Sequence, residues 1–87
     1  MKTYLITPTN EGQDLNYVEV FKFGRRGAMT RANFIAKRLA ETFKDASIGI
    51  KVEDSETLKL AYYGVARLIG HDLPNQWEIV DMTKEMR

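Results

Sequence analysis

The stretch Ser47-Ile48-Gly49-Ile50-Lys51-Val52-Glu53 alternates apolar and polar side chains residue by residue. Successive side chains of a β-strand point to opposite faces, so this alternation predicts a strand whose buried face is formed by Ile48, Ile50 and Val52. A strand with one buried face needs neighbouring strands and an apolar layer packed over it. The segments on either side of it therefore decide the fold.

The segment before this strand predicts a helix. Thr30 has the side chain of an N-cap residue, and the helix is expected to extend to about Lys44. Met29 and Phe34 are spaced to contact each other across the helix start as a hydrophobic staple. At about 100° per residue the apolar side chains share one side, and the alanines among them indicate a close approach to a sheet. The members of this side are Ala32, Ile35, Ala36, Leu39, Ala40, Phe43 and Ala46.

Residues 57–69, after the strand, allow two interpretations. Asp54-Ser55-Glu56-Thr57 supplies an N-cap and early acidic residues, as at the start of a helix. The apolar residues that would share one helical face are Leu58, Ala61, Tyr62, Val65, Leu68 and Ile69. Leu58, Leu60 and Tyr62 also alternate at period two, as in a strand of a hairpin. The helix is favoured because helical spacing continues through Ile69, whereas the alternation ends at Gly64.

The remaining segments predict strands. Residues 2–7 are rich in β-formers and end at Pro8, residues 16–23 are β-branched and aromatic, and residues 76–82 form a last strand. A loop is expected at Gly24-Arg25-Arg26-Gly27. The resulting order, ββαβαβ, predicts a single α+β domain over residues 1–87. We expect about four strands in a mixed or antiparallel sheet with two helices packed on it.

Composition excludes several classes of protein. The 87 residues are 44% hydrophobic and 29% charged, as in an ordinary soluble domain, and no apolar run approaches the roughly 20 residues that span a bilayer. The absence of cysteine excludes disulfides and Cys-ligated metals, and the single histidine, His71, argues against a His-based metal site. Met1–Asn10 lacks the apolar core of a signal peptide. We expect a cytoplasmic protein without cofactor, metal or membrane partner.

Catalytic residue patterns are weak, so we expect a protein that is not an enzyme. A loop pair such as His71-Asp72 is more typical of a surface than of an acid–base site. The Gly24–Gly27 loop matches neither glycine motif that binds phosphates. The acidic residues 53–56 lack the spacing of a calcium loop and suit a helix N-terminus.

Positive charge is concentrated in the middle of the chain. Residues 21–45 have a net charge of +5, whereas residues 1–20 and 46–87 each have −2, which leaves +1 for the whole chain. Such asymmetry can steer an oppositely charged partner, although Lys and Arg also cover ordinary solvated helices.

Phe34 interrupts the polar side of the predicted helix. A Phe surrounded by Arg and Lys is typical of a protein–protein anchor or of a platform on which bases stack. The alternative is that Phe34 folds back onto Met29 in the staple. The candidate partner-binding face consists of Arg25, Arg26, Arg31, Phe34, Lys37 and Arg38.

Three kinds of partner suit this chain. An acidic protein surface, or a surface that normally binds nucleic acid, complements clustered basic side chains. Nucleic acid is the second candidate, but the pI near 8.0 is low for it and no helix-turn-helix, zinc-finger or RNA-recognition signature is present. The third hypothesis is a homo-oligomeric structural subunit, such as a homodimer, that contacts its copies through strand edges and the exposed Leu60 and Tyr63.

The start of the chain carries a resemblance to a known group. Met1-Lys2-Thr3-Tyr4-Leu5-Ile6-Thr7-Pro8, followed by a polar loop, a strand and an alanine-rich helix, resembles the opening of small phage-encoded anti-CRISPR proteins of the type I-E group. These are compact single domains without catalytic residues that bind the bacterial surveillance complex and block interference. The resemblance covers these residues and the strand–strand–helix order, roughly half the chain. It implies a phage or mobile-element inhibitor or accessory protein that docks on a host protein or ribonucleoprotein complex in the host cytoplasm, and it assigns no site residue.

Overall fold

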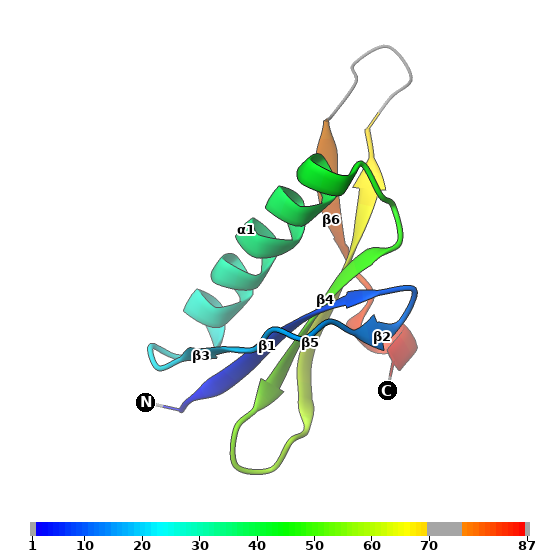
Figure 1. The fold of residues 1–87 in the computed structure, drawn as a ribbon. Helices are drawn as coiled ribbons and strands as arrows, with labels where there is room; N and C mark the ends of the chain where they lie inside the picture. Colours follow the sequence, from blue (N-terminus) through cyan, green and yellow to red (C-terminus); the bar gives the residue numbers. More distant parts are fainter. Residues whose placement is uncertain (1, 70–75, 87) are drawn as a thin grey trace.

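One α-helix lies along one face of a six-stranded antiparallel sheet in the computed structural model, which describes residues 2–69 and 76–86 (Figure 1). The strand order is β2-β1-β4-β5-β6, and β3 pairs with β1 on the same edge as β2. The elements in chain order are β1 Tyr4–Asn10, β2 Gln13–Asp14, β3 Glu19–Phe21, α1 Arg25–Phe43, β4 Ile48–Asp54, β5 Leu60–Leu68, β6 Trp77–Asp81 and the 3-10 helix η1 Thr83–Met86.

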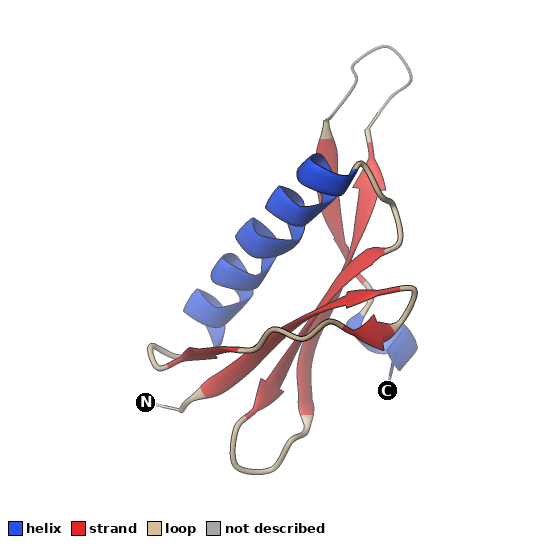
Figure 2. Cartoon of the chain, in the orientation of Figure 1, coloured by secondary structure: helices blue, strands red, loops and turns tan. Residues whose placement is uncertain are grey.

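The class is α+β, but the predicted arrangement of four strands and two helices is wrong. The sheet has six strands, and α1 is the one α-helix of the described residues (Figure 2). The second predicted helix, over residues 57–69, is the strand β5. This strand pairs with β4 on one side and β6 on the other, so it lies inside the sheet.

The residues before β5 explain why a helix was predicted there. Asp54 Oδ1 accepts the backbone N–H groups of Glu56 at 2.8 Å and Thr57 at 3.2 Å. These are the bonds of an N-cap, but an aspartate makes the same bonds in a tight turn. Here the chain reverses at Leu58, whose φ is 59°, and returns as the next strand of a hairpin.

The first strand continues through Pro8, where the sequence predicted its end. The carbonyl oxygen of Pro8 accepts the N–H of Leu15 at 2.9 Å, so the main-chain groups of Pro8 face away from β4 and toward the sheet edge. Proline lacks an N–H and is tolerated in a strand where no ladder bond is required. Pro8 lies between the two short edge strands, where this condition is met.

Helix α1 begins five residues before the predicted N-cap, at Arg25, with Gly24 as its N-cap residue. Thr30 therefore lies within the helix, and its hydroxyl donates to the carbonyl of Arg26 at 3.1 Å. The predicted staple is absent because Met29 packs partly buried against the core while Phe34 is exposed. Phe43, expected on the buried side, is exposed as well.

The core lies between α1 and the sheet. Ala28, Ala32, Ala36 and Ala40 recur every four residues along α1 and are fully buried. Alanine lets the helix approach the sheet closely, where it meets branched side chains of β1 and β4. The aliphatic branched side chains of the sheet with the least exposure are Ile6, Ile48, Ile50 and Val52. The alternation that predicted the strand at residues 47–53 therefore identified its buried face correctly.

Candidate docking face of helix α1

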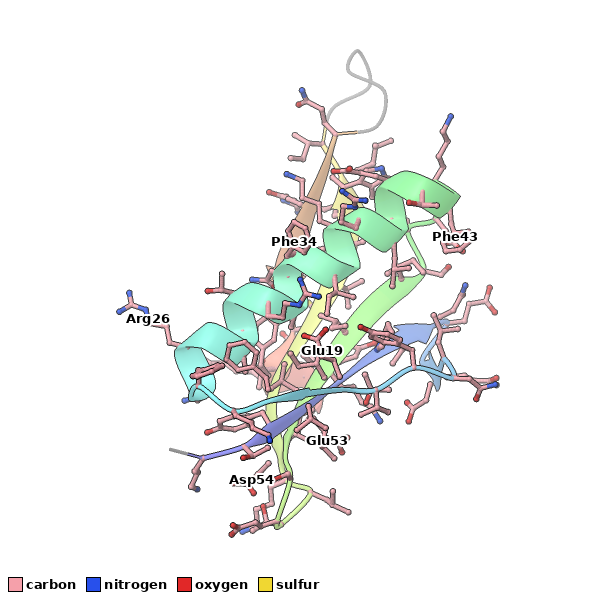
Figure 3. The ribbon with its side chains drawn as sticks, turned by 60° about the vertical axis from the view of Figure 1, so that its left-hand side comes forward. Glu19, Arg26, Phe34, Phe43, Glu53 and Asp54 are labelled. Carbon is pink, nitrogen blue, oxygen red and sulfur yellow. The ribbon has the colours of Figure 1, made fainter. Side chains whose placement is uncertain are left out.

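The outer side of α1 presents one contiguous face. At about 100° per residue, Arg26, Lys37, Phe34, Arg38 and Arg31 fall in this order within about 140° of the helix circumference, with Phe34 near the middle. We call these five residues the basic helix face. Its centre is apolar and open to solvent, because the Phe34 side chain is 54% exposed. Figure 3 shows Phe34 midway along the helix and Arg26 near its N-terminal end.

Two guanidinium groups hold the Phe34 ring. Arg31 Cζ lies 5.4 Å and Arg38 Cζ lies 5.9 Å from the centre of the ring. Both distances are within the range in which a cation is attracted to an aromatic face. The ring is therefore kept on the surface by its own neighbours, although an exposed aromatic side chain gains nothing from burial there.

Glu19 of β3 fixes the position of Arg31. Arg31 donates from Nε to Glu19 Oε2 at 2.7 Å and from Nη2 to Glu19 Oε1 at 2.9 Å. Glu19 Oε1 also accepts from the Tyr17 hydroxyl at 3.1 Å. A bidentate pair of this geometry orients the guanidinium and neutralises its charge. Arg31 thus supports the Phe34 ring, while the net positive charge of the face comes from Arg26, Lys37 and Arg38.

We expect the contribution of the Glu19–Arg31 pair to stability to depend on pH. The hydrogen bonds from Arg31 hold the pKa of the Glu19 carboxyl below its ordinary value. A lowered pKa in the folded state stabilises the protein above the unfolded pKa, about 4.3, and this contribution is lost as the pH falls through the folded pKa. Glu19→Gln should lower the free energy of unfolding at pH 7 by about 1 kcal/mol or less. Denaturant titrations should show the difference from the wild type shrinking below about pH 4; a difference that is constant with pH would contradict this.

A shallow recess, largely open to solvent, lies beside Phe34 at the N-terminal end of α1. It has a volume of about 650 Å³ and is lined by Phe21, Arg26, Gly27, Thr30, Arg31 and Phe34. Gly27 makes this arrangement possible, because a Cβ on it would stand 2.8 Å from Cε1 of the Phe21 ring. A glycine within a helix lowers stability by roughly 1 kcal/mol relative to alanine. At position 27 the missing side chain leaves the space that the Phe21 ring occupies. The lining of this recess combines two aromatic rings with two arginines.

Five of the six predicted face residues lie together, and one does not. Arg25 lies on the same side of the helix as the buried alanines, and its Nη2 donates to the carbonyl of Ala61 at 3.0 Å. Conversely, the sequence did not point to Glu19, Phe21 or Gly27. Each of these contributes through a contact between β3 and α1. The signal in the sequence is that Glu19 and Phe21 are two residues apart in a predicted strand, so their side chains share a face.

Other candidate sites have structural roles or lie outside the described residues. Asp54 caps the β4–β5 turn and pairs with Lys2 at 3.2 Å, and the N–H groups of Glu56 and Thr57 lower the pKa of its carboxyl. Within residues 2–69 and 76–86, no three His, Cys, Asp or Glu side chains are placed to hold a metal ion. His71 and Asp72 are outside this range. Among the described residues, no helix combines the length and apolarity required to cross a membrane.

Comparisons with known proteins found no match to any family model, curated protein or solved structure. The resemblance to anti-CRISPR proteins therefore stays a prediction.

Proposed function

We propose that this protein is a non-enzymatic binding protein that docks the basic helix face onto an acidic surface of another protein or ribonucleoprotein. The observation that carries the proposal is the exposed Phe34 ring, which has the guanidinium groups of both Arg31 and Arg38 within cation–π distance. Binding hot spots are enriched in aromatic and arginine side chains that sit at the centre of a contact. Phe34 is an aromatic side chain with two arginines beside it, and it lies at the centre of the basic helix face.

The charge around Phe34 favours an acidic protein surface over nucleic acid. Among the described residues, Arg26, Lys37 and Arg38 form no salt bridge, so their charge is available to a partner. Glu19 and Glu41 lie beside them, and nucleic-acid sites usually track the phosphate backbone with an unbroken series of cations. The recess between Phe21 and Phe34 instead suits an apolar side chain of a protein partner. A host complex attacked by a phage or mobile element is one such partner, as the resemblance implies.

Phe34→Ala tests the proposal. We expect the dissociation constant for the partner to rise by about 30-fold, which corresponds to about 2 kcal/mol, because the central anchor is removed. Phe43→Ala is the matched control: Phe43 is 63% exposed on the same helix but lies outside the basic helix face (Figure 3). Partners are first captured from a lysate of the encoding organism with wild-type protein and both variants, and affinities are then measured with the purified partner.

The outcomes separate the two classes of partner. A purified protein whose affinity falls with Phe34→Ala but not with Phe43→Ala supports the proposal. Labelled single- and double-stranded DNA and RNA are assayed in parallel at low and moderate salt. A nucleic acid bound through Phe34, with an affinity that drops steeply with salt, would overturn the proposal in favour of nucleic-acid binding.

A further inference from the structure

The outer edge of β6 is not paired with any strand of the described residues. The N–H of Met82 donates to Tyr63 O at 2.8 Å, and Gln76 O accepts the N–H of Ile69 at 2.8 Å, so even-numbered residues of this segment bond to β5. In an antiparallel ladder the main-chain groups of the alternate residues point the other way. The N–H and C=O of Trp77, Ile79 and Asp81 therefore face outward, where no described strand pairs with them.

The two edges of the sheet differ in how they are protected. On the far edge, β1 is covered by the short strands β2 and β3, with Pro8 between them. Charged residues usually protect an open edge against pairing with another strand. In β6, however, the charge of Glu78 is already paired with Arg67 of β5, and Trp77, Ile79 and Val80 are apolar. The carboxylate of Asp81, at the end of the strand, accepts the N–H of Thr83 of the same chain. The β6 edge is therefore able to accept another strand.

We propose that this edge pairs with β6 of a second copy of the chain, in antiparallel orientation about a two-fold axis at Ile79. Ile79 would then face Ile79 of the second copy, and Trp77 would face its Asp81. All three residues with outward main-chain groups become hydrogen-bonded pairs in this register. The two sheets join into one continuous sheet, and the contact is self-complementary as a two-fold interface requires.

Charge and register favour this axis over its neighbours. Moving the axis to residue 78 places Glu78 directly opposite Glu78 of the second copy, and directly opposed like charges are destabilising. Moving it to residue 80 leaves Trp77 outside the ladder. With the axis at Ile79, Glu78 faces Val80 of the second copy instead.

A recess of about 310 Å³ lies beside the β6 edge, on the side of the sheet that carries Glu78 and Val80. Val65, Val80 and Met82 contribute to its lining, so apolar surface of both copies borders the junction.

A proline substitution tests the pairing without breaking the domain. Ile79→Pro removes an N–H that points away from β5, a position at which an edge strand tolerates proline. Ile79→Ala is the matched control, because it truncates the partly buried side chain but retains the N–H. In a concentration series by sedimentation or light scattering, wild type and Ile79→Ala should dimerise. Ile79→Pro should weaken dimerisation by about tenfold or more. A wild type that stays monomeric at every concentration would overturn the proposal.

Cysteine pairs test the register. The chain has no cysteine, so introduced thiols are unique. Glu78 and Val80 of the second copy would form a non-hydrogen-bonded pair with Cα atoms about 4.5 Å apart, within the range of a disulfide. Equal amounts of Glu78→Cys and Val80→Cys protein should therefore give a covalent dimer on oxidation. Either variant alone should cross-link far less, because its thiols are diagonal and about 7–8 Å apart. Equal cross-linking in all three samples would overturn the register.

Discussion

Replacing Ile50 with alanine is expected to lower the free energy of unfolding by about 2–5 kcal/mol. Ile50 is fully buried in β4, the strand between β1 and β5, and its side chain points into the layer beneath α1. The fully buried helix residues above that layer are alanines, whose single methyl groups cannot extend into the space that the substitution leaves. The cavity therefore persists, and the lost contacts add to the lost transfer free energy.

Thermal and chemical unfolding measure this effect. Small domains are stable by only about 5–15 kcal/mol, and each kcal/mol shifts the Tm of a domain of this size by roughly 4–8 °C. Val20→Ala is the control, because this β-branched side chain is 53% exposed on an edge strand and should cost less than about 0.5 kcal/mol. Similar losses for the two variants would contradict the position of the core between α1 and β4.

The parts of the fold that the sequence predicted are those that local spacing determines. The alternation of Ile48, Ile50 and Val52 is a property of a strand with one buried face, and the spacing of Ala32, Ala36 and Ala40 is a property of a helix against a sheet. Both were assigned to the correct buried side. Neither pattern depends on which other segment supplies the opposite surface.

The parts that the sequence did not predict depend on distant partners. An aspartate accepts the same two backbone hydrogen bonds in a turn as at a helix start. The local sequence around Asp54 therefore could not distinguish a turn from a helix. Residues 60–68 form a strand and not a helix because β4 and β6 pair with β5 along both of its edges. Gly64 lies opposite Ile50 and is covered by the Tyr62 ring, which explains why a glycine interrupts the alternation without ending the strand.

In the candidate site, too, local spacing predicted some features, whereas contacts with distant segments determined the others. The basic residues of α1 lie close together in the sequence, so helical spacing alone placed most of them on one face. Their pairing with β3 was not predictable in this way, because Glu19 reaches Arg31 only after the chain turns back at Gly24. As a result the face presents less free positive charge than the sequence indicates, and Phe34 has a larger share in the proposed contact.

Reversing two charges of the basic helix face is expected to abolish partner binding without unfolding the domain. Arg26→Glu combined with Arg38→Glu places carboxylates on both sides of Phe34, against a partner surface that we propose to be acidic. Like charges brought together at an interface cost several kcal/mol, so the affinity should fall by more than about 100-fold. Both arginines are exposed and form no described salt bridge, so the free energy of unfolding should change by less than about 1 kcal/mol.

The control for this variant changes the net charge by the same amount, but at positions outside the basic helix face. Lys59→Glu combined with Lys84→Glu also replaces two exposed basic residues, but they lie in the β4–β5 hairpin and in η1. Attraction through the net charge of the whole protein would be lost equally in both double variants, whereas a localised contact is lost only in the first. Binding is measured with the purified partner at two salt concentrations. A partner that binds Arg26→Glu/Arg38→Glu as tightly as the wild type would remove the basic helix face as the docking site.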